Sequence, residues 1–403
     1  MLNCSEIKQC IACGSDDLFF LFDLKNQPLA NSYKQNENDE EEYFPLAINL
    51  CNSCSHVQLT YKVNPNLLFK NYLYVSGTTK TQLEYFDWFA KFALENHDGD
   101  VESVLDIGCN DGSQLDFFKK EKIKTYGIDP ALNLFSTSSK NHEIICDYFN
   151  NYNFDSNKKF DIIVCQNAFA HNFNQLEFLQ KASTLMNDKT KLYITTSQSN
   201  MILNNEFDTI YHEHLSFYNI KSMDRLCTRA GLNLIDVTKH TIHGTSYIFV
   251  ISLKKKRPTH ILNLINNEHN KHLYDKSTYI RYVENCTGVL NNFSKVIEKF
   301  KQQGRSVIGY GAAAKGNTLL NAANVKLDMI IDDNPLKQGL YTPGISSKIV
   351  SPEVLLEFDQ KEKIVFIPLA WNFFKEIKER IKNKRPSSQD LFVKYFPNFC
   401  IEE

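Results

Sequence analysis

Val104-Leu-Asp-Ile-Gly-Cys-Asn-Asp-Gly112 is the stretch that decides the fold of the middle of this chain. An apolar run reaches Asp106, a glycine-containing loop follows, and the sequence from Ser113 onward is typical of a helix. A second apolar run ends at Asp129, 23 residues after the first acid. A glycine-rich turn between a strand and a helix, with an acid about 20 residues further on, predicts a nucleotide-binding half of an α/β fold.

The acids of this turn favour a cationic ligand over a pyrophosphate. A dinucleotide turn places three glycines in G-x-G-x-x-G spacing, so that backbone N–H groups can surround the pyrophosphate. Here the turn reads D-I-G-C-N-D-G, with Asp106 and Asp111 flanking it. These carboxylates would repel a pyrophosphate but suit a sulfonium and an α-amino group. The turn therefore predicts S-adenosylmethionine as cofactor, with a turn that binds no ligand as the alternative.

The composition is that of a globular protein with more than one domain. At 403 residues two or three domains are expected, and 42% hydrophobic with 23% charged residues can build ordinary cores. The net charge of −2 gives no overall attraction to nucleic acid or to a membrane surface, and no apolar run approaches the length of a membrane span. We expect a monomer without nucleic-acid or membrane partners.

The N-terminus and the cysteines indicate the compartment. The first residues lack the basic and apolar regions of a signal peptide. Eleven cysteines without an export signal are typical of a reducing compartment, where they serve as thiols or metal ligands. The sequence thus predicts a cytoplasmic protein.

Four cysteines are arranged as two knuckles, Cys10-Ile-Ala-Cys13 and Cys51-Asn-Ser-Cys54. Each C-x-x-C turn can direct two thiolates at one ion, and two such turns complete a tetrahedral site for Zn²⁺. A redox role is the alternative, but neither pair stands between a strand and a helix as in thioredoxin. Cys4 is near enough to compete as a ligand. The pattern predicts a closed, structural zinc site, because thiolates fill all four positions.

Strands and helices alternate after the glycine turn. Short apolar runs at residues 144–146, 161–165 and 191–195 are separated by amphipathic stretches, which is the pattern of a parallel sheet. Residues 232–237 and 246–253 have period-two character and predict an antiparallel hairpin at the sheet edge. A parallel sheet that ends in a reversed hairpin matches the class I methyltransferase fold, which is Rossmann-like.

The C-terminal region predicts a second α/β unit. Residues 259–303 carry apolar side chains at helical spacing and are expected to form one long helix. Residues 305–319 again predict strand, glycine turn and helix, and 327–335 again predict a strand that ends in acids. We expect three segments: a zinc module at 1–70, a methyltransferase domain at 71–255, and a helical linker with a second Rossmann-like domain at 256–403.

The motifs together resemble those of a family of sugar C-methyltransferases that build branched deoxysugars. The matching residues are the two knuckles, Asp106-Ile-x-x-Asn-Asp-Gly112, Asn167-x-x-x-His171, Asp208-Thr-Ile-Tyr-His-Glu-His214, His243-Gly-x-Ser246 and Gly309-Tyr-Gly-Ala-x-Ala-Lys-Gly-Asn-Thr-Leu-Leu-Asn321. They span nearly the whole chain in the family's order. The resemblance implies an N-terminal zinc module, a central S-adenosylmethionine domain and a C-terminal Rossmann-like domain. It also implies a nucleotide-linked 4-keto-deoxysugar substrate, methylated at C-3.

Carbon methylation next to a ketone needs a base, because the carbon nucleophile exists only after a proton has left. Histidine is the natural base near neutral pH, and donors aimed at the enolate oxygen lower the barrier. The resemblance implies that His214 is the base, that Glu213 orients it, that Tyr211 reaches the sugar and that His171 lies beside the ketone. A structural polar cluster is the alternative for these residues. His212 is expected to be structural.

The resemblance also implies the cofactor contacts. Asp106, Gly108 and Asn110 would hold the methionyl end, Asp129 the ribose and Asp147 the adenine amine, and Asn167 would close the floor of the pocket. For Asp147 a helix N-cap is an equal alternative.

The substrate side departs from the family pattern. The family places a third tyrosine after Tyr72 and Tyr74, and Thr78 stands in its place here. An arginine that commonly follows the H-G-x-S motif is also absent. Lys315 and Asn317 would reach a phosphate or a sugar, with a structural role as an equal alternative. O-methylation of a sugar hydroxyl and a non-catalytic nucleotide-sugar-binding protein therefore stay open as alternatives.

Overall fold

The structure is a computed structural model that describes residues 3–403 except 71, 73, 197–200, 243–244 and 255–257. His243 and Gly244 of the H-G-x-S motif therefore lie outside the described residues. The described chain forms two compact units. The first consists of Met1–Phe20, Asn49–Asn200 and Glu213–Asp275, and the second of Leu21–Ile48, Met201–His212 and Lys276–Glu403. The three-segment division expected from the sequence stays a prediction.

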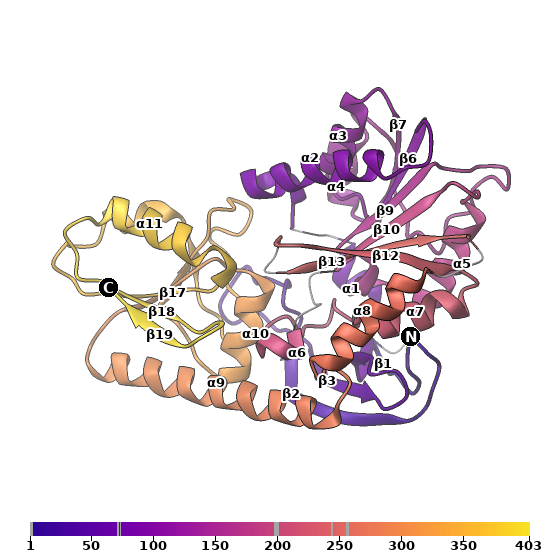
Figure 1. The fold of residues 1–403 in the computed structure, drawn as a ribbon. Helices are drawn as coiled ribbons and strands as arrows, with labels where there is room; N and C mark the ends of the chain where they lie inside the picture. Colours follow the sequence, from indigo (N-terminus) through magenta and orange to yellow (C-terminus); the bar gives the residue numbers. More distant parts are fainter. Residues whose placement is uncertain (1–2, 71, 73, 197–200, 243–244, 255–257) are drawn as a thin grey trace. The chain divides into compact units, whose positions relative to one another are not determined.

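The first unit is built on a sheet whose described strands run in the order β12-β13-β10-β9-β6-β7-β8 (Figure 1). Strands β6 to β10 are parallel, and β13 pairs antiparallel with both β10 and β12. The predicted parallel sheet with a reversed edge hairpin is thus confirmed. The strands are β6 Ser103–Ile107, β7 Lys124–Ile128, β8 Glu143–Ile145, β9 Ile162–Gln166, β10 Lys191–Thr196, β12 Asn233–His240 and β13 Ser246–Ser252.

Helices cover both faces of this sheet because its strands are apolar on both sides, as buried parallel strands are. The helices are α2 Lys80–Glu95, α3 Ser113–Lys120, α4 Leu132–Ser138, α5 Gln175–Thr184, α7 Ile220–Arg229 and α8 Thr259–Asn270. Alternate residues of a strand point to opposite cores. Val104, Val164 and Tyr193 belong to the core shared with α2 and α3, whereas Leu105, Ile163 and Ile194 belong to the core shared with α5, α7 and α8.

The N-terminal part of the chain adds short strands and helices. In the first unit β1 Cys4–Glu6 pairs with β5 Tyr61–Val63, and β4 Val57–Leu59 pairs with β11 Ser216–Phe217. The chain passes into the second unit within β2 Leu18–Pro28 and returns within β3 Tyr43–Cys51. Two short helices, α1 Pro65–Phe69 and the 3₁₀ turn η1 Ser76–Thr78, precede α2, and a further 3₁₀ turn, η2 Phe169–His171, follows β9.

The second unit has its own sheet, with the described strands in the order β16-β15-β14-β17-β18-β19. All its pairs are parallel except the last, β18 with β19, so the predicted second Rossmann-like unit is confirmed. The strands are β14 Val307–Tyr310, β15 Met329–Ile331, β16 Ile349–Val350, β17 Val365–Pro368, β18 Leu391–Lys394 and β19 Cys400–Glu402. The helices are α6 Met201–Asn204, α9 Lys276–Gln302, α10 Ala314–Ala323, η3 Pro352–Leu356, η4 Trp371–Phe373 and α11 Phe374–Lys384.

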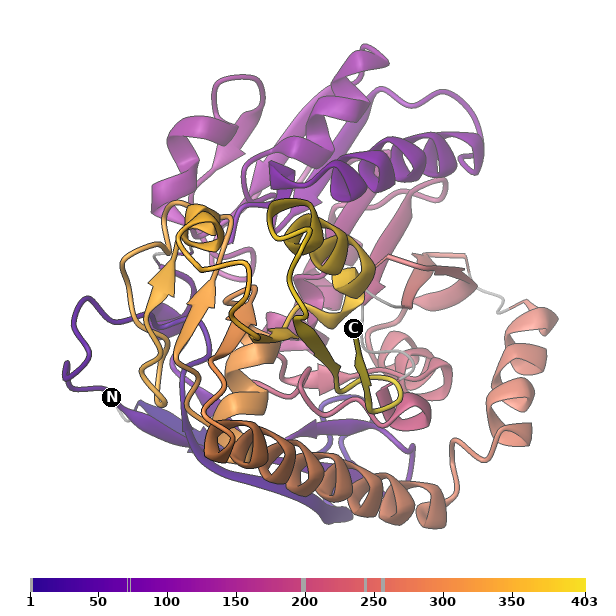
Figure 2. The same ribbon diagram turned by 90° about the vertical axis from the view of Figure 1, so that its left-hand side faces the viewer.

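The single long helix expected at 259–303 is wrong, because the segment forms two helices, α8 and α9 (Figure 2). The chain leaves helical geometry at His272, whose φ is +59°. The His272 ring lies 2.8 Å from the Asp275 carboxylate, just before α9 begins. A left-handed residue cannot continue a right-handed helix. None of the described helices has the length and apolarity needed to cross a membrane.

Candidate functional site

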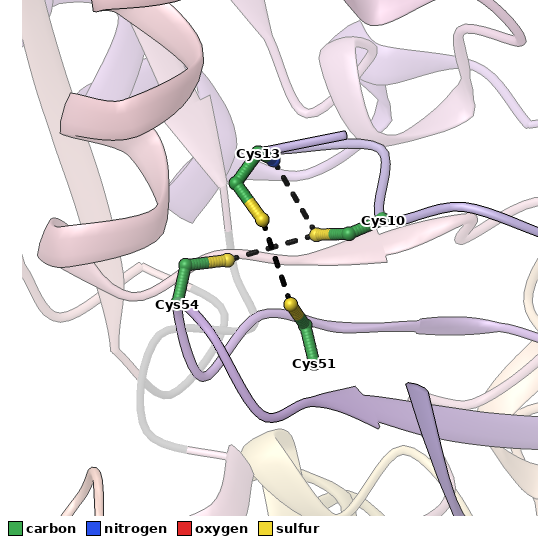
Figure 3. A group of neighbouring side chains, drawn as sticks. All are labelled: Cys10, Cys13, Cys51 and Cys54. Atoms are coloured by element: carbon green, nitrogen blue, oxygen red, sulfur yellow. Dashed lines mark hydrogen bonds between the residues drawn. The ribbon is translucent and has the colours of Figure 1, made fainter. Parts of the chain in front are cut away.

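The four knuckle cysteines converge on one point, as Figure 3 shows. Their sulfur atoms all lie within 4.8 Å of one another, with Cys10 to Cys54 at 3.6 Å and Cys13 to Cys51 at 3.5 Å. Four thiolates around Zn²⁺ at about 2.3 Å would stand about 3.8 Å apart, so this donor set fits a tetrahedral zinc ion. Cys4 lies outside the cluster, in β1, where it pairs with Val63.

Close packing of the sulfurs couples their protonation. Hydrogen bonds from Cys10 and Cys54 lower the pKa of the Cys51 thiol well below its usual range. The interaction with Cys51 in turn raises the pKa of Cys10 to about 12. A divalent cation is the group that stabilises all four sulfurs as thiolates.

The first knuckle is fixed from helix α7. The Arg229 guanidinium donates hydrogen bonds to the carbonyls of Ile11 at 3.1 Å and Ala12 at 3.0 Å. Gly14 adopts φ of +81°, and a Cβ added there would stand 3.1 Å from the same guanidinium. The cysteines Cys10, Cys51 and Cys54 are buried in the core that also contains α7. The metal site is thus part of the core of the first unit.

Gly108 and Asp129 fix the backbone of the glycine turn after β6. Gly108 has φ of +80° and donates its N–H to the Ile128 carbonyl at 2.8 Å, while a Cβ added there would stand 2.5 Å from Ala168 Cβ. The Asp129 carboxylate accepts the N–H groups of Asn110 at 2.9 Å and Ala131 at 2.8 Å. The turn therefore needs glycine, and Asp129 holds its shape while keeping lone pairs for a further donor.

Polar atoms without partners gather at the carboxyl ends of adjacent strands. Among the described residues, Asp106 Oδ1, Asn167 Oδ1, His171 Nε2 and Thr196 Oγ1 are buried without a hydrogen-bond partner. They lie at the end of β6, after β9 and at the end of β10, which are neighbours in the sheet. A buried polar atom without a partner is costly, so such a row is typical of a ligand site. Sequence reasoning did not find Thr196.

Asp106 is the most perturbed acid of this row. Burial and the nearby carboxylates of Asp129 and Asp111 raise the pKa of Asp106 to about 8. A cationic ligand would offset both causes. The residues present therefore fit S-adenosylmethionine, whose sulfonium and amino groups are positive.

The other predicted cofactor residues lie along the same edge. Asn167 follows β9 with φ of +54°, and its backbone N–H bonds to the Thr195 carbonyl at 3.0 Å. Asp147 follows β8, and its carboxylate accepts the N–H of the next residue, Tyr148, at 2.7 Å. The described residues after Asp147 form a turn and no helix, so the N-cap alternative is wrong.

The predicted catalytic residues of the first unit form a compact cluster. The rings of His171 and His214 stack with centroids 5.2 Å apart, and the His171 ring stacks on Phe69 at 5.5 Å. The Tyr72 hydroxyl donates a hydrogen bond to Glu213 Oε2 at 3.0 Å. The structure thus brings together His171, Glu213 and His214, and adds Tyr72 to them.

Burial determines the protonation of His171 within this cluster. Burial lowers the pKa of His171 to about 4, so this ring is neutral at neutral pH. A neutral His171 does not oppose a positive charge on the stacked His214. Phe69 was missed by sequence reasoning, because nothing in an apolar residue of a short helix marks it as a neighbour of the predicted catalytic residues.

Two residues of the same motif belong to the second unit. Tyr211 is half-buried. His212 is buried, its Nε2 lies 3.3 Å from the Phe44 carbonyl, and burial lowers its pKa to about 4. The motif therefore spans the boundary between the units.

The expected sugar-binding residues before α2 have different environments. Thr78 is exposed and its hydroxyl donates to the Val75 carbonyl at 3.0 Å, inside its own turn. The Tyr74 side chain is 46% exposed, and its carbonyl accepts a hydrogen bond from Asn110 Nδ2 at 3.0 Å. Both ends of the Asn110 amide are used, since its Oδ1 also accepts the Ser76 N–H at 2.9 Å.

The second unit holds a separate group of unpaired polar atoms. Among the described residues, Lys315 Nζ and Asp208 Oδ1 are buried without a hydrogen-bond partner. Lys315 Nζ lies 5.1 Å from the centre of the Trp371 ring, whose N–H donates to Asp208 Oδ2 at 2.7 Å. Burial raises the pKa of Asp208 to about 6, and the Lys315 cation limits the rise. The Asn317 amide donates to the Ala30 carbonyl at 2.7 Å.

Three parts of the chain match known families. Residues 10–69 match the family described as "Putative zinc binding domain", 78–237 match "Methyltransferase domain", and 241–397 match "C-methyltransferase C-terminal domain". These matches follow the order expected from the sequence.

The chain is also similar to individual proteins. The chain is 26% identical over 389 residues to C-methyltransferase NovU of Streptomyces niveus, covering 92% of this chain and 91% of that protein. A solved S-adenosylmethionine-dependent methyltransferase of Clostridium acetobutylicum is 13% identical, with a TM-score of 0.36 over 42% of this chain and 92% of its own. Magnesium protoporphyrin IX methyltransferase of Synechocystis is also 13% identical, with a TM-score of 0.34 over 45% and 87%.

Proposed function

We propose that this chain, which belongs to the zinc-containing, S-adenosylmethionine-dependent C-methyltransferases, methylates C-3 of a nucleotide-linked 4-keto-deoxysugar. It is a methyltransferase whose cofactors are S-adenosylmethionine and zinc. The observation that supports the proposal most is the stacked pair of His171 and His214, with Glu213 and Tyr72 beside them.

The cofactor is assigned to the carboxyl edge of the first sheet. Asp106 and the backbone around Gly108 and Asn110 would hold the methionyl end, and Asp129 the ribose. Asp147 would meet the adenine amine, and Asn167 would close the floor with its unpaired Oδ1. Bound there, S-adenosylmethionine supplies the methyl group.

His214 is assigned as the base that removes the proton from C-3. Its charge after proton uptake is tolerated because the stacked His171 is neutral. His171 has a buried, unpartnered Nε2 and would face the ketone oxygen, where a donor stabilises the developing enolate. Glu213 accepts the Tyr72 hydroxyl and would orient the base, while Tyr211, Tyr74 and Thr78 would reach the sugar.

In the second unit Lys315 is assigned to a phosphate of the nucleotide, together with Asn317. The support is a buried ammonium group without a partner among the described residues, over one face of Trp371. An unpaired buried cation is costly, and a phosphate oxygen would offset that cost.

Deuterium exchange tests the acceptor atom. Incubation with a panel of nucleotide-linked 4-keto sugars in heavy water should exchange the C-3 proton, and His214→Ala should abolish the exchange. O-methylation, the second candidate that Thr78 keeps open, would transfer methyl with every carbon-bound proton retained. Mass spectrometry of the same reactions should show a gain of one methyl. Binding of the sugar without either change would support the non-catalytic alternative and overturn the proposal.

A further inference from the structure

Polar side chains hold the described backbone of the segment that carries Tyr72. We call the described residues Tyr72 and 74–78 the tyrosine segment. Its Tyr72 N–H donates to Asn133 Oδ1 at 3.1 Å, and Asn133 Nδ2 donates to the Tyr72 carbonyl at 2.9 Å. One amide side chain thus pairs with both backbone groups of one residue, as an adjacent strand would.

The other end of the tyrosine segment is held in the same way. Asn110 accepts the Ser76 N–H and donates to the Tyr74 carbonyl, and Asp111 Oδ2 accepts the Gly77 N–H at 2.9 Å. A Cβ added at Gly77 would stand 2.7 Å from that carboxylate oxygen, so the approach is close. Both ends are therefore fixed by polar side chains.

These side chains come from the turn after β6 and from helix α4, which follow the assigned cofactor acids Asp106 and Asp129 in the sequence. Asn110 and Asp111 belong to the turn after β6, which begins beyond Asp106, and Asn133 lies in α4, four residues after Asp129. The tyrosine segment is consequently attached both to the turn after β6 and to α4.

The Tyr72 side chain extends from this fixed backbone to the catalytic cluster. Its hydroxyl reaches Glu213, and its ring makes a T-shaped contact with the Phe69 ring, with centroids 5.9 Å apart. The Phe69 ring itself stacks on His171. A displacement of the Tyr72 backbone would therefore move the hydroxyl away from Glu213.

We propose that Asn133 is a positioning residue, which holds the Tyr72 backbone so that the Tyr72 hydroxyl meets Glu213. The inference rests on the proposed role of this cluster in methyl transfer. Asn133 has no evident structural duty in α4: its side chain is exposed, it does not cap the helix, and asparagine is a poor helix former. Its side-chain amide instead forms two hydrogen bonds with the Tyr72 backbone.

Hydrogen exchange tests the contact between the Asn133 side chain and the Tyr72 backbone, and it needs no sugar substrate. In the zinc-loaded protein with S-adenosylhomocysteine, amide-resolved exchange at Tyr72 should be at least about tenfold faster in Asn133→Ala than in the native chain. Asn133→Asp keeps the acceptor and should retain the protection. Thr137→Ala, an exposed position on the same helix, is the matched control and should change nothing. Exchange at Ser76 and Gly77 should stay unchanged in all variants. An unaltered Tyr72 amide in Asn133→Ala would overturn the proposal.

A double-mutant cycle tests the functional consequence. Asn133→Ala should lower kcat by five- to tenfold, with KM for S-adenosylmethionine within twofold and the thermal midpoint unchanged. In a Tyr72→Phe background the same change should have no further effect, because the hydroxyl that Asn133 positions is gone. Independent, multiplying losses would show that Asn133 does not act through Tyr72. If no sugar in the panel is methylated, the acceptor proposal fails, while the exchange experiment still decides on Asn133.

Discussion

The two glycine turns of the molecule share one geometry and differ in the charge they leave unpaired. In the first, Gly108 N–H bonds to the last carbonyl of β7 and Asp129 accepts the Asn110 N–H at 2.9 Å. In the second, Gly311 N–H bonds to the last carbonyl of β15 at 2.7 Å. Asp332 accepts the Ala312 N–H there at 2.6 Å. Each turn is thus held by the acid that follows the next strand.

The two turns differ in which buried polar atoms near them have no hydrogen-bond partner among the described residues. Beside the first turn, among the described residues, these atoms include Asp106 Oδ1 and Asn167 Oδ1, two oxygens that could each accept a hydrogen bond from a ligand. In the second, the Ala312 carbonyl is covered by the Tyr33 hydroxyl at 2.5 Å and by Lys337 at 2.8 Å. The buried cation Lys315, at the start of α10, stays unpartnered among the described residues. The same turn can therefore serve a cationic ligand in one unit and an anionic one in the other.

The largest expected effect is on Asp106. Asp106→Asn should weaken S-adenosylhomocysteine binding by at least about 100-fold, because the amide cannot pair with the ligand's ammonium group. Lys315→Ala should leave this affinity unchanged. Titration calorimetry on both variants measures the contrast. Equal losses in the two would remove the distinction between the turns.

The same substitution should stabilise the ligand-free protein. The folded pKa of Asp106 is about 8, against about 3.9 for an unfolded aspartate. A raised carboxyl pKa contributes stability that is full below about pH 4 and is lost as the pH rises towards 8. Asparagine carries no such loss, so Asp106→Asn should raise the free energy of unfolding at pH 7 by roughly 1–3 kcal/mol. Denaturant unfolding at pH 4 and pH 7 should show the gain growing with pH.

The sequence predicted the parts of the site that depend on local order along the chain. The turn after Asp106, the acid at Asp129 and the two cysteine knuckles each follow from spacing within a short stretch, and the structure contains them. The Asn133 side-chain amide binds the backbone of Tyr72, which lies 61 positions away in the sequence. No residue pattern marks this contact. The break between α8 and α9 likewise depends on one left-handed residue, His272, which apolar periodicity does not detect.

The next effect, about tenfold per pH unit, concerns the pH dependence of cofactor binding. At pH 6 to 7 most Asp106 is protonated, since its pKa is about 8. The ammonium group of S-adenosylhomocysteine needs the carboxylate, so the affinity for this ligand should rise about tenfold between pH 6 and pH 7. The residual affinity of Asp106→Asn should not vary over this range. A flat profile in the native protein would assign the cation to another group.

The smallest expected effect is on the second turn. Lys315→Ala should weaken binding of a nucleoside diphosphate by several-fold, since one charge-assisted hydrogen bond to phosphate is lost. Lys315→Arg keeps the charge and should recover part of the affinity. The loss of affinity is modest because the substitution also removes a buried cation that is costly in the free protein. The substitution also leaves Asp208 without its nearby positive charge. Calorimetry at two salt concentrations separates the contributions: the native affinity should fall more steeply with salt than that of Lys315→Ala, because the variant has lost a charged contact. Equal salt dependence in the two proteins would mean that Lys315 does not meet a phosphate, and the second turn would then serve packing alone.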